Sequence, residues 1–133
     1  MRLYHLVLTA LLAATPGMQE ATALPRIPHL TDAPRPHLTE IQKVEKLIAF
    51  VSSMEGATFI RNGSKHSCAE AAQHLQAKWQ KHKADVKTAE EFIEKLASKS
   101  GMSGEDYLIQ FSDGHTETAA VVLTRALREM EQQ

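Results

Sequence analysis

The segment Tyr107-Leu108-Ile109-Gln110-Phe111, followed by the turn residues Ser112-Asp113-Gly114, decides the fold class of this 133-residue chain. It is rich in aromatic and β-branched residues, and it is the strongest strand signal in the sequence. A short return strand is expected at His115 to Glu117. A second β-prone run, Thr58-Phe59-Ile60-Arg61, enters a turn at Asn62-Gly63, because both residues tolerate a positive φ. These runs predict a small antiparallel sheet of two or three strands.

Apolar residues in the other segments recur at helical spacing, which predicts four helices. The first begins at Thr39, which forms a capping box with Gln42. Further capping boxes at Ser67-Cys68-Ala69-Glu70 and Thr88-Ala89-Glu90-Glu91 begin the second and third helices, and Thr118 caps the last. Gly56, Lys83 and Gly101 mark the ends of the first three helices. Apolar residues expected on buried faces are Ile41, Val44, Leu47, Ile48, Val51, Met54, Ala71, Ala72, Leu75, Trp79, Phe92, Ile93, Leu96, Ala97, Val122, Leu123, Ala126, Leu127 and Met130. The order of elements predicts a helix-dominated α+β fold.

The first 23 residues have the pattern of a cleavable secretory signal. Arg2 supplies the positive charge, an apolar run follows from Leu6 to Ala14, and Ala21-Thr22-Ala23 has the small residues that signal peptidase accepts. We therefore expect export to the periplasm with cleavage after Ala23. The apolar run is too short for a membrane anchor, which needs about 20 residues, so no stable membrane anchor is expected after cleavage.

Residues 24–38 form a proline-rich leader that contains Pro25, Pro28, Pro34 and Pro36. Proline fixes its own φ and disfavours the helical region for its predecessor, so an extended, flexible leader is expected. It serves either as a spacer or as a proline-rich ligand for a partner, and the spacer is favoured because the segment has no motif for an aromatic groove. Residues 39–133 are then expected to form a single domain.

Composition excludes several functions. Fifteen Lys and Arg balance sixteen Asp and Glu, which argues against a nucleic-acid binder, since such proteins usually carry a basic stripe. The single cysteine excludes an internal disulfide and any multi-thiolate metal site within the chain. Histidines at positions 66, 74 and 82 step by eight residues, so no helical ligand pair forms and no metal site is expected. Nucleotide-binding and hydrolase signatures are absent, and we expect no cofactor.

One polar cluster is the best candidate for a binding site. Arg61-Asn62-Gly63 ends a strand, His74 and Lys78 are four residues apart on one helix face, and a hydroxyl-rich loop runs from Ser100 to Tyr107. If these segments converge, the two basic side chains and the turn amides would suit a carboxylate or a phosphate, such as the carboxylate of a cell-wall peptide. The structural alternative is that Asn62 and Gly63 only form the turn, Arg61 pairs with a nearby carboxylate, and His74 and Lys78 are solvated.

Cys68 is a second candidate, because it occupies the first position of a helix, where the helix dipole favours a thiolate. His66 is two residues away and could act as its base. Glu70 in the same turn opposes deprotonation, and the alternative is a small side chain that fills space at the helix start. The sequence therefore favours a non-enzymatic binding module for an anionic ligand or a protein partner, with a thiol-dependent redox or enzymatic protein as the alternative.

The chain also resembles a family of small exported bacterial proteins, the YfeK-like domain of unknown function. The resemblance rests on Phe59-Ile60-Arg61-Asn62-Gly63, on Ala69-Glu70-Ala71-Ala72-Gln73-His74-Leu75 with Lys78, and on Thr88-Ala89-Glu90-Glu91-Phe92-Ile93, and it continues through Ser103-Gly104 and Tyr107. It covers about Thr39 to Met130. It implies export to the periplasm and a shared fold, and it implies no activity for any residue. Asp106 stands where the family commonly has proline.

Overall fold

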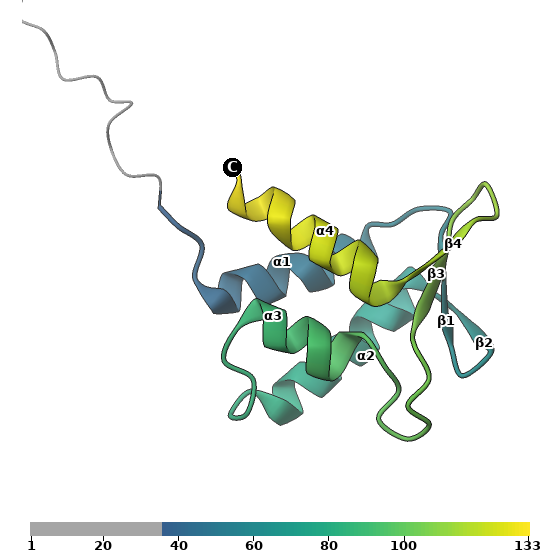
Figure 1. Ribbon diagram of the computed structural model, residues 1–133, viewed down its shortest axis with the longest axis horizontal. Coiled ribbons are helices and arrows are strands. Elements are labelled where there is room, and N and C mark those ends of the chain that lie inside the picture. Colours follow the sequence, from purple (N-terminus) through teal and green to yellow (C-terminus); the bar gives the residue numbers. More distant parts are fainter. Residues whose placement is uncertain (1–35) are drawn as a thin grey trace, which may run out of the picture. The chain divides into compact units, whose positions relative to one another are not determined.

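A computed structural model describes residues 36–133 (Figure 1). The expected signal sequence and nearly all of the proline-rich leader, residues 1–35, lie outside the described residues. The elements in chain order are α1 (Glu40–Ser52), β1 (Thr58–Arg61), β2 (Ser64–Ser67), α2 (Cys68–His82), α3 (Ala89–Phe92), the π-helix η3 (Ile93–Ala97), β3 (Leu108–Gln110), β4 (Thr116–Thr118) and α4 (Ala119–Glu131). The predicted α+β class, dominated by helices, is confirmed.

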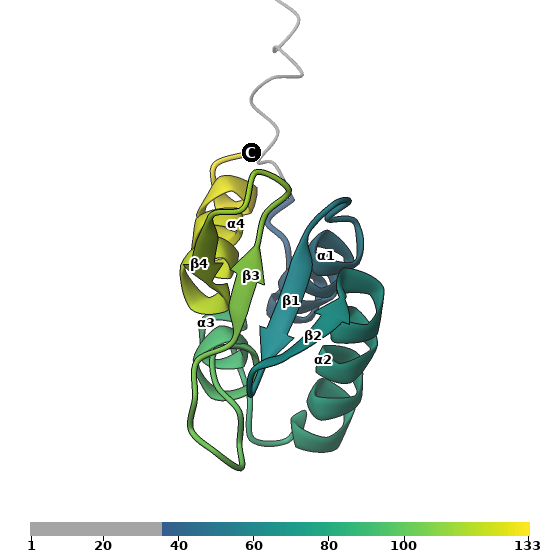
Figure 2. The same ribbon diagram turned by 90° about the vertical axis from the view of Figure 1, so that its right-hand side faces the viewer.

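The sheet has four antiparallel strands in the order β2-β1-β3-β4. Figure 2 shows the strands side by side, with the helices behind them. Phe59 of β1 pairs with Ile109 of β3 in the centre of the sheet, and both side chains are buried. Since successive strand residues point to opposite faces, Phe59 and Ile109 supply the helix-facing side of the sheet.

The sheet has one strand more than the two or three that the sequence predicts. Asn62 and Gly63 both have a positive φ, 51° and 77°, and they join β1 to β2 as a two-residue hairpin turn. The extra strand β2, of sequence Ser-Lys-His-Ser, is polar and mostly exposed. It has no alternation of apolar residues, because it lies at the sheet edge and buries little. The return strand β4 begins at Thr116, one residue later than expected.

Helix starts follow the predicted caps. Thr39 and Ser67 each form a complete capping box, with Gln42 and Glu70 respectively. The Thr88 hydroxyl accepts from the backbone N–H of Glu91, but the Glu91 carboxylate accepts from the backbone N–H of Lys87 at 2.7 Å in place of that of Thr88. The third capping box is therefore only half formed.

The third helix departs from the expected one. It is α-helical only for Ala89–Phe92, continues as the π-helix η3, and ends at Ala97, four residues before Gly101. The backbone beyond this point bonds to a returning loop: the carbonyl of Ser98 accepts from Tyr107, and the N–H of Ser100 donates to Glu105, both at 2.9 Å. These cross-loop bonds replace the helical ones.

The core lies between the helices and the inner face of the sheet. Most of the apolar residues expected inside are buried, and Leu47, Leu75, Phe92, Ile109 and Leu123 are completely inaccessible. Ile41 is an exception, because 58% of it is exposed, so its predicted place on the buried stripe of α1 is wrong. Within residues 36–133, no helix has the length and apolar character needed to cross a membrane.

Candidate functional site

The predicted polar cluster comes together at one end of β1. The side chain of Arg61, the last residue of β1, reaches His74 on α2, and its Nη1 lies 2.9 Å from Nε2 and 3.2 Å from Nδ1 of the imidazole. A guanidinium can only donate hydrogen bonds, so a ring nitrogen of His74 accepts and the imidazole is neutral. We refer to Arg61, His74 and Lys78 as the basic cluster.

Lys78 lies one helical turn beyond His74 and is half-buried. Its Nζ donates to the backbone carbonyl of Leu96 at 2.7 Å and to the hydroxyl of Tyr107 at 3.3 Å, and it lies 5.3 Å from the centre of the Tyr107 ring. That ring is buried against Phe59, with ring centres 5.3 Å apart. Lys78 and Tyr107 therefore connect α2 to η3 and to the sheet, and their polar groups already have partners.

Asn62 fixes the loop that follows η3. Its side-chain amide donates to the hydroxyl of Ser100 at 3.2 Å and its side-chain oxygen accepts from the hydroxyl of Ser103. The Ser100 hydroxyl also accepts from the backbone of Met102 and Ser103. The loop therefore packs beside the β1–β2 turn, as the convergence hypothesis requires. A Cβ atom added at Gly63 would meet no other atom within 4 Å, so the positive φ that the turn needs is the reason for glycine there.

The basic cluster has no acidic partner in the described part of the chain. Among residues 36–133, no carboxylate oxygen lies within 4.0 Å of a side-chain nitrogen of Arg61 or Lys78. The expected alternative for Arg61, pairing with a nearby carboxylate, is therefore wrong, because Arg61 contacts a neutral imidazole. Burial, and after it the positive charge of Arg61, lowers the pKa of both His74 and Lys78.

The basic cluster borders only a small depression. The depression has a volume of about 30 Å³ and is lined by Phe59, Arg61, His66, Glu70, Ala71 and His74. This is about the space that one water molecule occupies. Only a small charged group could therefore sit against Arg61 and His74, and the rest of any ligand would lie on the surface.

The geometry does not favour the reactive thiol. Cys68 is buried, and its Sγ lies 3.4 Å from the carbonyl oxygen of Ala57, to which it donates. Burial raises the pKa of this thiol, which is opposite in direction to the lowered pKa that the thiol hypothesis requires. His66, the proposed base, has its Nδ1 3.9 Å from a carboxylate oxygen of Glu70. Cys68 thus packs at the helix start, as its structural alternative describes.

A larger hollow was not predicted from the sequence. It is a cleft of about 460 Å³ between the α3–η3 segment and α4, and its lining includes Glu90, Ile93, Glu94, Ser98, Thr124, Leu127 and Arg128. The cleft depends on how two helices of distant sequence pack, and η3 is a π-helix, for which the sequence shows no signal. We refer to it as the α3–α4 cleft. Within the described part of the chain, no group of three or more His, Cys, Asp or Glu side chains could hold a metal ion.

Comparison with known proteins gives a family without an assigned function. The chain is similar to an uncharacterised protein, YfeK, of Salmonella typhimurium, with 35% identity over 68 residues, which is 51% of this chain and 57% of that protein. The match thus spans little more than half of that relative. No solved structure matches the chain. The model of a family of unknown function, DUF5329, matches residues 38–131. This match covers nearly all the residues that fold here, and the chain belongs to the DUF5329 family.

Proposed function

We propose that this protein is a small non-enzymatic binding module of the periplasm, which holds an anionic group at Arg61 and His74. The observation that carries this proposal is a basic cluster without a carboxylate partner among residues 36–133. Within residues 36–133, only Nη1 of Arg61 has a hydrogen-bond partner, the imidazole of His74, so the other N–H groups of the guanidinium can donate to a ligand. A carboxylate or phosphate would supply the acceptors and offset the positive charge.

His74 gives the site a pH-dependent component. Burial, and after it the positive charges of Arg61 and Lys78, disfavours the protonated imidazole. An anion bound beside His74 would favour the protonated form, and by linkage protonation would strengthen anion binding. We therefore expect the bound anion to raise the pKa of His74.

The groups that could perform acid–base chemistry are otherwise engaged, which supports a binding role. The amine of Lys78 and the hydroxyl of Tyr107 contact each other, and the amine also bonds to the carbonyl of Leu96. The shallow depression beside Arg61 favours a free anion or the charged end of a larger molecule, because it has space for a head group only.

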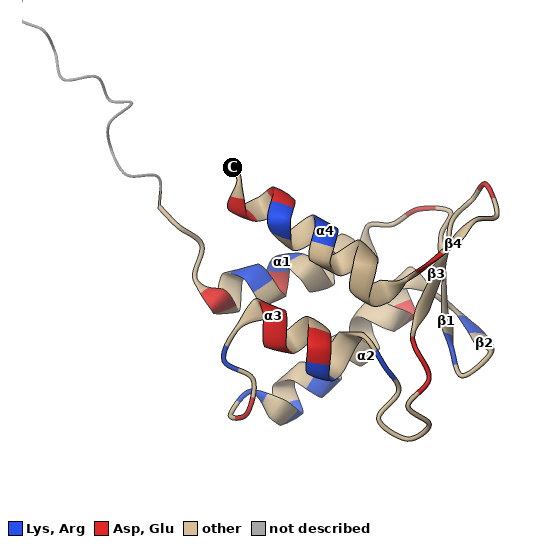
Figure 3. Ribbon diagram, viewed as in Figure 1, with Lys and Arg blue, Asp and Glu red and all other residues tan. Residues whose placement is uncertain are grey.

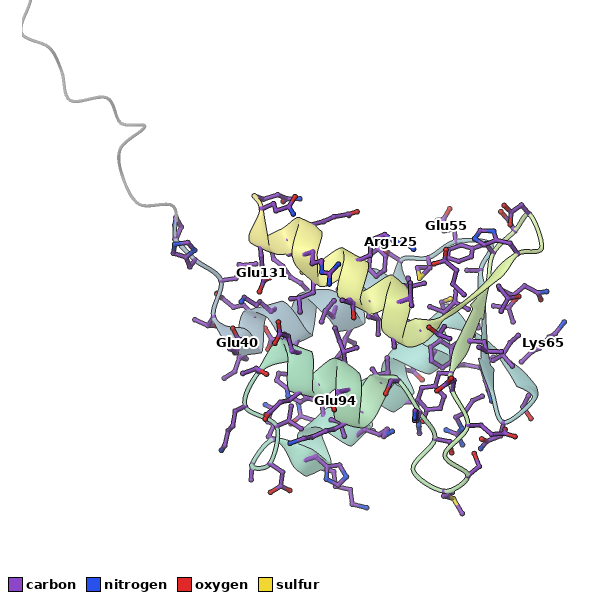
Figure 4. All side chains as sticks on the ribbon, in the orientation of Figure 1. Glu40, Glu55, Lys65, Glu94, Arg125 and Glu131 are labelled. Atoms are coloured by element: carbon purple, nitrogen blue, oxygen red, sulfur yellow. The ribbon has the colours of Figure 1, made fainter. Side chains whose placement is uncertain are left out.

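The test is an NMR titration of the purified protein with inorganic phosphate and, separately, with acetate. We expect saturable shifts of the Arg61 and His74 signals and a rise in the pKa of His74. Arg61→Gln should weaken binding about 10- to 100-fold, since a charge-assisted hydrogen bond contributes about 1.5–3 kcal/mol. Lys65→Gln is the matched control: it removes the same charge from an exposed strand residue whose side chain extends away from the helices (Figure 4). Equal effects of the two variants would contradict the proposal.

The location has its own test. Expression of the full chain in a Gram-negative host, followed by fractionation, is expected to place it in the periplasm, with Leu24 as the first residue of the mature protein. The pattern of Arg2, the apolar run and Ala21-Thr22-Ala23 supports this expectation. A chain that keeps Met1 and stays in the cytoplasm would contradict it.

A further inference from the structure

The α3–α4 cleft has the size of a ligand site and lies apart from the basic cluster. Its volume of about 460 Å³ falls in the range of small-molecule sites, about 300–1,000 Å³. Ile93 of η3 and Leu127 of α4, both almost fully buried, contribute to the apolar part of its lining. The hydroxyl of Thr124 on α4 adds a polar group. The cleft therefore offers an apolar surface for part of a ligand.

The two walls carry opposite charges. Glu90 and Glu94 belong to the α3–η3 wall and Arg128 to the α4 wall, and Figure 3 shows acidic positions along the α3–η3 segment and basic ones on α4. None of these three side chains forms an ion pair within 4.0 Å or a hydrogen bond within residues 36–133. Opposite charges thus line one cleft without neutralising each other.

A further carboxylate in the cleft, that of Glu131, already has an ion-pair partner. Glu131 also lines the cleft, at the end of α4 (Figure 4), but its carboxylate pairs with Lys43 of α1 at 2.8 Å. The acidic side chains that remain available on the α3–η3 wall are Glu90 and Glu94. Lys99 and Asp106, from the segment after η3, also line the cleft. Among the lining residues that lie on the helices themselves, the side chains without an ion-pair partner within residues 36–133 are carboxylates on the α3–η3 wall and a guanidinium on the α4 wall.

We propose that the α3–α4 cleft binds a zwitterion with an apolar body, of the class of apolar dipeptides with free ends. Its ammonium group would lie against Glu90 and Glu94, and its carboxylate would accept from Arg128. Its side chains would lie against the apolar lining, to which Ala120 contributes together with Ile93 and Leu127. A guanidinium suits a carboxylate because it donates two parallel hydrogen bonds. A dipeptide extends about 7 Å, so its two charged ends can reach side chains on opposite walls that form no ion pair with each other.

Calorimetric titration of the protein with leucyl-leucine tests this proposal. We expect saturable binding with a dissociation constant of about 1 mM or tighter. N-acetyl-leucyl-leucine lacks the ammonium, and leucyl-leucine amide lacks the carboxylate, so each should bind at least about tenfold more weakly. This comparison uses the unaltered protein and does not depend on whether a variant folds.

Variants assign the two ends. Arg128→Gln should weaken binding of leucyl-leucine but have little further effect on its amide. The double variant Glu90→Gln/Glu94→Gln should also weaken binding of leucyl-leucine, but it should have little further effect on N-acetyl-leucyl-leucine. Lys65→Gln and the double variant Glu55→Gln/Glu129→Gln, which change exposed charges outside the cleft, should bind leucyl-leucine normally.

Two outcomes would overturn the proposal. One is the absence of any binding of leucyl-leucine, and the other is equal binding of the free and the end-blocked peptides. Arg61→Gln separates this site from the anion site, because it should leave the affinity for leucyl-leucine unchanged. Failure of phosphate to bind at Arg61 would therefore leave the α3–α4 cleft proposal intact, and the reverse also holds.

Discussion

Replacement of Lys78 by methionine would test whether this residue is mainly structural. Methionine keeps the apolar stem but removes the ammonium, which donates to the carbonyl of Leu96 at 2.7 Å and to the hydroxyl of Tyr107 at 3.3 Å. Hydrogen bonds to charged groups contribute about 1.5–3 kcal/mol. Part of this is offset, because Lys78→Met also removes the burial of a charge and its repulsion with Arg61, which both lower the pKa of Lys78. The expected net loss is about 1–2 kcal/mol in the free energy of unfolding.

For a domain of this size, 1 kcal/mol corresponds to about 4–8 °C in Tm. Lys78→Met should therefore lower Tm by about 5–15 °C, measured by circular dichroism. Lys81→Met is the control, because Lys81 is exposed on the same helix, and it should change stability by less than about 0.5 kcal/mol. Equal Tm values for the two variants would refute the structural role of Lys78.

Three further predictions concern other residues. The lowered pKa of His74 means that the unfolded chain binds its proton more readily, so stability should fall as pH decreases from 7 through the ordinary histidine pKa; a His74→Gln variant with an unchanged pH profile would contradict this. Thr118→Ala removes the hydroxyl that accepts from Val121 and should cost about 1 kcal/mol in a urea titration, while no change would mean that the cap is unimportant. Cys68 should react with iodoacetamide much more slowly in the native than in the denatured protein, because it is buried and its pKa is raised; equal rates would restore the reactive-thiol hypothesis.

The sequence predicts local structure correctly where a few neighbouring residues determine it. The caps at Thr39, Ser67 and Thr118 all form, because a side chain and a backbone N–H three residues later need no distant partner. The strand β2 is not predicted, although the hairpin signal is present: Asn62-Gly63 with positive φ at both residues is a typical two-residue turn. The polar residues of β2 form a strand because their backbone pairs with that of β1, and their own sequence gives no strand pattern.

Candidate residues are predictable as a group, but their roles are not. Arg61, Asn62, His74, Lys78 and Tyr107 do converge, since a strand end and the face of the following helix lie close together. Some of these side chains form hydrogen bonds within the protein and are not available to a ligand. Which ones do so depends on the positions of η3 and of the loop after it. The α3–α4 cleft is not predictable, because its walls come from helices about thirty residues apart in the sequence.

The π-helix η3 lies between the two proposed sites and connects them. On the side of α2, its Leu96 carbonyl accepts from Lys78, while Ile93 and Glu94 of the same five residues line the α3–α4 cleft. Loss of the Lys78 ammonium should therefore loosen η3 and weaken binding of leucyl-leucine, whereas Arg61→Gln should not, because Arg61 bonds to His74. For this reason Arg61, and not Lys78, is the residue to change when the anion site is tested. Unchanged affinity of Lys78→Met for leucyl-leucine would mean that η3 keeps its position without this bond.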